Sequence, residues 1–113
     1  MVDQDTARAL ALSFPEVYEE DHFGKPSFRI RKKIFSTIWL KENIMMIRLN
    51  EVDQSIFCDI DPKIIYPVDG TWGKQGATKF ELSLVDEDIL FDALTKSYCN
   101  IAPKNLVALV ENR

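Results

Sequence analysis

The sequence has little of what metal sites and nucleophilic catalysis require. Its 113 residues include two cysteines, Cys58 and Cys99, and one histidine, His22. The cysteines are far apart and neither lies in a CxxC pattern, so a structural zinc site is not expected. No pattern links His22 to a nucleophile, so no pair of base and nucleophile can be named. We therefore expect no metal, no cofactor and no catalytic residue, and we predict that the protein is not an enzyme.

Long apolar runs and linkers are also missing. No apolar run approaches ~18 residues, so a membrane span is not expected. The N-terminal residues 1–5 are acidic and do not resemble a secretory signal, and the two cysteines are then expected to stay reduced. No stretch rich in Pro, Gly or Ser divides the chain. We predict a cytoplasmic protein with one domain, residues 1–113.

The N-terminal half carries signals for one helix and three strands. Asp3 or Asp5 can cap a first helix, which ends before Pro15. Three strand-like runs follow, separated by short turns that join antiparallel neighbours. The strands are expected at Pro26–Arg31, Ile34–Lys41 and Ile44–Leu49, with turns at Lys32-Lys33 and Lys41–Asn43.

The C-terminal half adds a helix, two strands and two further helices. Asn50 can cap a short helix with Val52, Ile56 and Phe57 facing inward, and Asp86 can cap the main helix. The strands are expected around Lys63–Tyr66 and over Thr78–Leu84, and Pro103 suits the start of a last helix.

The resulting order is α–β–β–β–α–β–β–α–α. It predicts an α+β fold, a two-layer sandwich in which a five-stranded antiparallel sheet is covered by helices on one face. Strand alternation and helical spacing predict a core that contains Phe28, Ile30, Phe35, Ile47, Phe80, Leu82, Leu90 and Leu94.

Several short motifs together resemble a known family. They are Phe14-Pro15 with Glu19-Glu20, Phe23–Pro26, Phe28–Ile30, Lys33–Phe35, Trp72–Gly76, and Ala93-Leu94 with Ser97-Tyr98. Over roughly residues 7–106 the chain is similar to the YjbR/MmcQ family of small bacterial proteins. The resemblance implies a two-layer α/β fold related to type III secretion chaperones, and a description as DNA-binding that is based on a winged arrangement of strands and helices. Where many members carry an aromatic residue after the Trp-Gly-x-x-Gly turn, this chain has Ala77.

Positive charge is concentrated in one part of an acidic protein. The total charge is −4, but residues 25–48 carry a net charge of +6 and the remainder −10. A basic hairpin can contact phosphates. The candidate nucleic-acid-binding residues are Lys25, Arg29, Arg31, Lys32, Lys33, Trp72 and Lys74. The simpler interpretation, which we favour, is that Arg29 and Arg31 line the solvent face of a strand and that Lys32-Lys33 form a solvated turn.

Two other segments have a functional and a structural interpretation. The segment Trp72–Gly76 can expose backbone N–H groups and a stacking ring to a phosphate or base, but a tight connection with Trp72 packed on the sheet is the favoured structure. Residues 19–22, Glu-Glu-Asp-His, could orient the histidine or bind a cation, but a solvated acidic connection is the default.

The leading functional prediction is a noncatalytic binding module that binds DNA weakly and without sequence preference. No expected helix carries the Arg, Asn and Gln cluster that reads base edges. The alternative is a protein-interaction module, similar to secretion chaperones, that binds a partner peptide or itself through an apolar sheet face at Ile38, Trp39 and Leu40. An enzyme would need a deep pocket that gathers His22 with other polar groups. We expect a monomer or a weak dimer.

Overall fold

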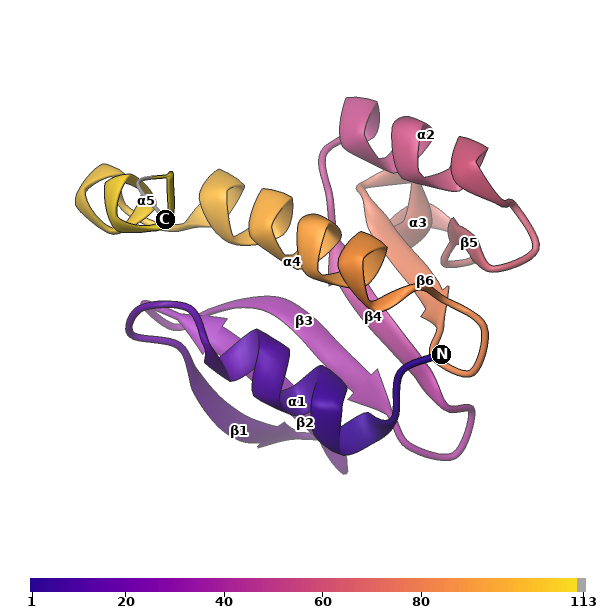
Figure 1. Ribbon diagram of the computed structural model, residues 1–113, viewed down its shortest axis with the longest axis horizontal. Coiled ribbons are helices and arrows are strands. Elements are labelled where there is room, and N and C mark those ends of the chain that lie inside the picture. The colour runs from indigo at the N-terminus through magenta and orange to yellow at the C-terminus, as the bar shows by residue number, and fades with distance from the viewer. Residues whose placement is uncertain (112–113) are drawn as a thin grey trace.

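Six antiparallel strands form one sheet in the computed structural model, which describes residues 1–111 of the chain. Their order across the sheet is β1-β2-β3-β4-β6-β5. The first four strands follow one another along the chain and across the sheet, as Figure 1 shows. The strands are β1 (Tyr18–His22), β2 (Lys25–Ile30), β3 (Lys33–Trp39), β4 (Ile44–Arg48), β5 (Ile65–Pro67) and β6 (Ala77–Glu81).

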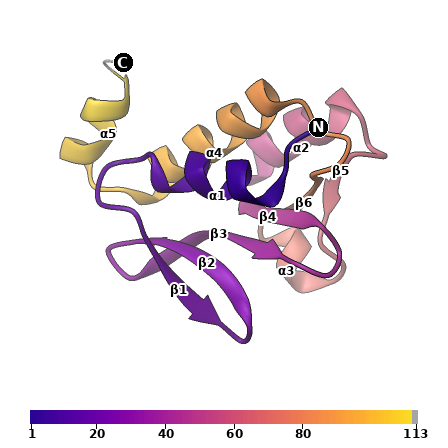
Figure 2. The same ribbon diagram turned by 60° about the horizontal axis from the view of Figure 1, so that its bottom comes forward.

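Helices lie on both faces of this sheet, but very unequally. The helices are α1 (Gln4–Leu12), α2 (Glu51–Ile60), α3 (Thr71–Lys74), α4 (Glu87–Ile101) and α5 (Lys104–Glu111). The longer helices α1, α2 and α4 cover one face, whereas the one-turn helix α3 lies at the other face (Figure 2). One face of the sheet is therefore the core, whereas the other carries only α3 among the described helices (Figure 2), although Ser27, Thr37 and Met46 on it are buried.

Side-chain caps begin three of the helices, as the sequence predicts. The carboxylate of Asp3 accepts a hydrogen bond from the backbone N–H of Thr6 at 2.7 Å. The side chains of Asn50 and Asp86 cap α2 and α4 in the same way. Each cap satisfies an N–H group that the helix itself leaves without a partner.

The predicted core is confirmed, since all eight residues named from the sequence are fully buried. Helix α4 packs its buried face on β3 and β4. There the ring of Tyr98 stacks on Phe14 with centroids 5.0 Å apart, and its hydroxyl donates to the carbonyl of Pro15 at 2.8 Å. The hydroxyl of Ser97 donates to the carbonyl of Phe35 at 3.2 Å. These contacts join the N-terminal segment, the sheet and the main helix.

The predicted number of strands was wrong, because residues 18–22 form a strand and not a solvated connection. Strand β1 pairs with β2 from Tyr18 opposite Arg29 to His22 opposite Lys25. Its residues are polar and half-exposed or exposed, so the sequence shows no apolar alternation that would predict a strand here. The strand exists because β2 offers it a hydrogen-bonding edge and because the two-residue turn Phe23-Gly24 folds the chain back.

The turn between β2 and β3 lies one residue earlier than predicted. Ile30 pairs with Lys33, so the turn residues are Arg31 and Lys32, with φ values of 51° and 70°. Two successive residues with positive φ define a type I′ turn, whose twist matches that of the flanking strands. Side chains alternate between the two faces along a strand. The shift of one residue therefore changes which cations of this hairpin lie on the same face.

One expectation about the second half was wrong. Val52 and Ile56 of α2 do not face inward but are 67% and 56% exposed, and only Phe57 of that predicted trio is buried. The connection between β5 and β6 contains the one-turn helix α3. The predicted strands around Lys63–Tyr66 and over Thr78–Leu84 become the shorter β5 and β6.

Candidate functional site

A basic pocket lies where the ends of three strands and three helices meet. It has a volume of about 490 Å³. Its charged members are all cations: Arg29 at the end of β2, Lys32 in the turn, Lys33 at the start of β3 and Arg48 at the end of β4. The full lining consists of Arg29, Lys32, Lys33, Ile34, Arg48, Leu49, Asn50, Gln75, Asn100 and Ile101. Four positive charges thus line one hollow in a protein whose total charge is −4.

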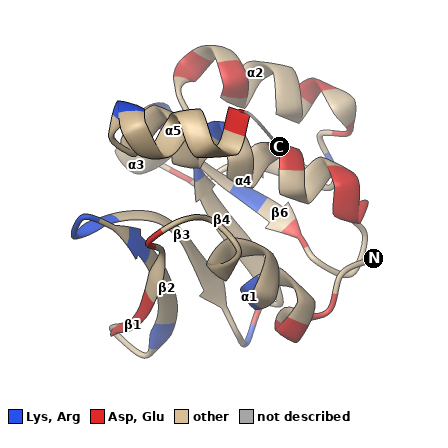
Figure 3. Ribbon diagram, turned by 60° about the vertical axis from the view of Figure 1, so that its left-hand side comes forward, with Lys and Arg blue, Asp and Glu red and all other residues tan. Residues whose placement is uncertain are grey.

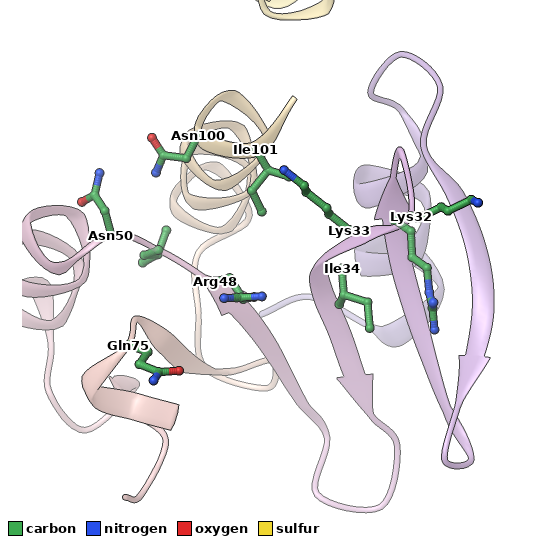
Figure 4. Close-up of a pocket in the computed structure, with 10 residues that line it drawn as sticks. Lys32, Lys33, Ile34, Arg48, Asn50, Gln75, Asn100 and Ile101 are labelled. Carbon is green, nitrogen blue, oxygen red and sulfur yellow. The ribbon is translucent and has the colours of Figure 1, made fainter. Parts of the chain in front are cut away.

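The positions of these side chains follow from the antiparallel register. Strands β2 and β4 both run antiparallel to β3. Their C-terminal ends therefore lie at the same end of the sheet, next to the start of β3. Figure 4 shows Lys33 extending from β3 toward Ile101 at the end of α4. Three amide side chains complete the lining with neutral donors and acceptors: Asn50, the N-cap of α2, Gln75, the C-cap of α3, and Asn100 in α4.

Arg29 is held in place, whereas the other three cations are not. Its Nε donates to the hydroxyl oxygen of Ser27 at 3.0 Å, and its guanidinium lies 3.5 Å from a carboxylate oxygen of Glu20. Its side chain is 19% exposed. No ion pair within residues 1–111 involves Lys32, Lys33 or Arg48. These three exposed cations remain available to an anion.

Arg31 does not line the basic pocket and is already paired. Its Nε and Nη2 atoms lie 3.0 and 3.3 Å from the two carboxylate oxygens of Glu16. This two-pronged contact raises the pKa of Arg31 above its ordinary value, chiefly through the hydrogen bond with Glu16. Arg31 is therefore already engaged with an anion of the protein itself, although its place in the basic stretch suggested the same role as its neighbours.

A second, aromatic pocket of about 340 Å³ lies on the face of the sheet that carries α3. It is lined by His22, Phe23, Lys25, Thr37, Trp39, Glu42 and Trp72. The indole N–H of Trp39 donates to the hydroxyl of Thr37 at 3.0 Å, which fixes the ring on β3. The ammonium groups of Lys79 and Lys25 lie 5.1 and 6.0 Å from the centroid of the Trp39 ring.

The structure explains the glycines of the segment Trp72–Gly76. A Cβ atom on Gly73 would lie 1.6 Å from the carbonyl oxygen of Val68, and one on Gly76 would lie 1.7 Å from that of Leu49. Both glycines are therefore needed for close backbone packing and not for a phosphate loop. Trp72 is 43% exposed and lines the aromatic pocket beside Thr37 and Trp39 of β3, so part of its ring remains accessible.

The predicted binding residues are therefore divided among several places. Arg29, Lys32 and Lys33 share the basic pocket, and Lys25 and Trp72 share the aromatic one. Arg31 is paired elsewhere, and Lys74 lies near Asp69 in a separate shallow hollow beside α3. Figure 3 shows the cations of the β2–β3 turn on one side of the molecule and acidic residues on α2 and at the start of α4.

Sequence reasoning missed Arg48, Asn50, Gln75 and Asn100 as members of the site. Arg48 lay within the basic stretch but followed an apolar strand far from the hairpin. Asn50 was recognised only as a helix cap. Nothing local marks Gln75 or Asn100, because they reach the pocket only through the packing of α3 and α4.

The remaining reactive groups are dispersed. Within residues 1–111 no three His, Cys, Asp or Glu side chains cluster as metal ligands would. Burial raises the pKa of the thiols of Cys58 and Cys99, which disfavours the nucleophilic thiolate. The His22 ring lies in the aromatic pocket, with its centroid 4.7 Å from that of Phe23. Among the described residues, no helix has the length and apolar character that crossing a membrane requires.

Comparison with known proteins agrees with this architecture. The YjbR family model matches residues 12–100, and the chain therefore belongs to the YjbR family. The fold is also similar to that of a crystal structure of the Deinococcus radiodurans protein DR2400, which carries a DUF419 domain. That match has a TM-score of 0.77 and 16% sequence identity, and it covers 93% of this chain and 82% of the other. No curated protein matches the chain significantly in sequence.

Proposed function

We propose that the protein is a noncatalytic module that binds nucleic acid weakly and without sequence preference, and that its basic pocket holds backbone phosphates. The observation that supports this most directly is the gathering of four cations, with no acidic residue among those that line the pocket. Each phosphate neutralised by a Lys or Arg releases condensed counterions, which favours binding at low salt. The exposed Lys32, Lys33 and Arg48 are the best placed for this role.

The expected affinity is modest. The total charge of −4 repels a polyanion at long range, so only the local field of the pocket favours binding. We expect a Kd in the range of nonspecific binding, roughly 10⁻⁴ to 10⁻⁶ M at physiological salt. Backbone phosphates are the same in every sequence, so contacts to them carry no sequence information.

A salt titration with a fluorescent DNA duplex tests this proposal. The double variant Lys33→Gln, Arg48→Gln should lower the affinity and reduce the slope of log K against log salt by about 0.9 for each phosphate that is no longer neutralised. Arg31→Gln is the matched control, since it removes a cation from the same hairpin that is already paired with Glu16. Equal effects of the double and the control variant, or no binding even at low salt, would contradict the proposal.

A second candidate function is protein interaction, but on a different surface from the one predicted. Of the three residues predicted for this role, Ile38 is only 1% exposed, Trp39 is half-buried in the aromatic pocket and Leu40 is 47% exposed, so they do not form the expected three-residue patch. Instead Val52, Ile56 and Ile60 of α2, spaced four residues apart, are 67%, 56% and 51% exposed. Such a stripe is typical of a helix face that meets a partner.

Self-association through this stripe would give the weak dimer that we expect as an alternative to a monomer. Sedimentation equilibrium over a range of protein concentrations can detect it. Ile56→Lys should then abolish association, and Leu109→Lys is a control because Leu109 is similarly exposed on α5. If the wild-type protein stays monomeric at all concentrations, the hypothesis of self-association is wrong.

A further inference from the structure

The aromatic pocket brings together the residues best suited to stacking. The chain has two tryptophans, Trp39 and Trp72, and both line this pocket, together with Phe23. They reach it from three separate elements: β3, α3 and the turn between β1 and β2. Its volume of about 340 Å³ lies within the range of small-ligand sites. Lys25, Glu42, Thr37 and His22 add hydrogen-bonding groups around the rings.

Two of the rings offer free surface, whereas the third forms a fixed floor. Phe23 is 89% exposed and Trp72 is 43% exposed, so neither is needed to fill the core. Trp39 is held by its hydrogen bond to Thr37 and has two ammonium groups near its ring. A flat ligand can therefore reach Phe23 and Trp72 without disturbing the sheet.

Phe23 also occupies a backbone position that does not suit it. It has a φ of 54° and Gly24 has a φ of 82°, so the pair forms the type I′ turn that joins β1 to β2. This turn strongly prefers Asn-Gly, and a bulky residue with positive φ is a genuine outlier. A strained residue that contributes an almost fully exposed ring is better explained by binding than by folding.

The aromatic pocket lies on the face of the sheet that also carries Arg29 and Arg48 of the basic pocket, whereas Asn100 and Ile101 line the basic pocket from the side of α4. Lys25 and Arg29 lie four residues apart on β2, about 13 Å at the strand rise, and line one pocket each. Ser27 lies between them on the same face, since its hydroxyl accepts from Arg29. Helix α3 links the pockets a second time, with Trp72 in one and Gln75 in the other. Single-strand sites span about 4–16 nucleotides, so one strand easily covers this distance.

We propose that the aromatic pocket binds an unpaired base of a single-stranded nucleic acid whose phosphates lie along the basic pocket. The inference rests on the proposed function and refines it, because it names single strands as the preferred ligand. Bases in a duplex are stacked on one another and cannot reach side chains without being extruded. Stacking of unpaired bases on aromatic side chains, combined with a basic surface, is the common mode of sequence-tolerant single-strand binding.

The test compares a 12-nucleotide oligothymidylate, a duplex of the same length and free thymidine monophosphate, at low salt. Binding is followed by quenching of the tryptophan fluorescence, which comes entirely from this pocket, and by anisotropy of labelled DNA. We expect the single strand to bind more tightly than the duplex and to quench the fluorescence. The mononucleotide should bind far more weakly, since it cannot reach the basic pocket at the same time.

Phe23→Asn is the decisive variant, because asparagine suits the turn while it removes the ring. It should keep or raise the melting temperature and lower single-strand affinity by roughly 5- to 150-fold, as the loss of one stacked base does. Affinity for the duplex should stay unchanged. Leu84→Asn is the matched control, since Leu84 is 59% exposed and lies outside both pockets. Trp72→Phe should retain more affinity than Trp72→Leu.

The outcomes separate this inference from the function on which it rests. Equal binding of single strand and duplex, with no effect of Phe23→Asn, overturns the base site and leaves the phosphate-binding function intact. A mononucleotide that binds as tightly as the oligonucleotide also overturns it, because the ligand is then a free nucleotide. If neither DNA binds at low salt, the proposed function itself is wrong.

Discussion

Replacing Gly76 by alanine should destabilise the protein through one added carbon atom. The new Cβ would lie 1.7 Å from the carbonyl oxygen of Leu49 and 2.9 Å from its carbonyl carbon. Backbone atoms cannot rotate aside as a side chain can, so the two segments must move apart. That movement would stretch the hydrogen bond that the N–H of Leu49 donates to the carbonyl of Gly76 at 2.9 Å. Leu49 precedes the cap of α2, so the start of that helix would be disturbed as well.

The size of the effect follows from two contributions. Forcing extra volume into a packed site costs about 1–3 kcal/mol. Alanine at the φ of 108° found here adds about 1–2 kcal/mol of backbone strain. For a chain of 113 residues the unfolding entropy is about 0.24 kcal/mol/K, so each kcal/mol lowers the melting temperature by about 4 °C. Gly76→Ala should therefore lower it by roughly 8–20 °C.

Gly24→Ala provides the matched control for this prediction. Gly24 also has a positive φ, 82°, but a Cβ there would meet nothing within 4 Å. Only the strain contribution applies, and the melting temperature should fall by about 4–8 °C. Thermal unfolding of both variants, followed by circular dichroism, measures the difference. Equal decreases would show that the close approach of residues 49 and 76 does not limit stability.

Three further perturbations test the core, a helix cap and one hydrogen bond. Leu94→Ala should cost about 2–5 kcal/mol of unfolding free energy in urea, since Leu94 is fully buried; an unchanged value would refute its place in the core. Asp86→Ala should cost about 0.5–2 kcal/mol by removing the cap of α4, and Asp86→Asn should retain most of it. The hydrogen bond from Tyr66 to the carboxylate of Glu81 raises the pKa of Tyr66 to about 12, so the unfolded chain loses this proton first as the pH rises. Its stabilisation is complete below pH 10 and disappears between pH 10 and 12, a decrease that should be smaller in Tyr66→Phe.

The local elements of this fold could be predicted because each depends on neighbouring residues. Alternation along β2, β3 and β4 identified the buried side of the sheet, and the capping residues Asp3, Asn50 and Asp86 marked three helix starts correctly. Strand β1 escaped prediction because it pairs with β2 alone and buries little. A strand of that kind forms only by pairing with the exposed edge of a sheet, and its own residues do not show which edge that is.

The orientation of α2 was mispredicted for a related reason. Val52 and Ile56 have the spacing of a buried stripe, and sequence alone offers no reason to leave them in water. In the structure Phe57 contacts the core instead, with its ring 6.2 Å from that of Phe80. Which face of an amphipathic helix is buried depends on the strand beneath it, a long-range contact that local spacing does not encode.

By itself the sequence determined the family resemblance, the α+β class, the core residues and the concentration of cations in residues 25–48. Only the tertiary structure decided which of those cations act together. Antiparallel pairing brought Arg48 to Arg29 and Lys33, while a turn shifted by one residue sent Arg31 to Glu16. The same packing placed Trp72 beside Trp39 and Phe23. A local pattern reveals which side of a strand faces the core, but the neighbours of a side chain depend on register and helix packing between segments far apart in the chain.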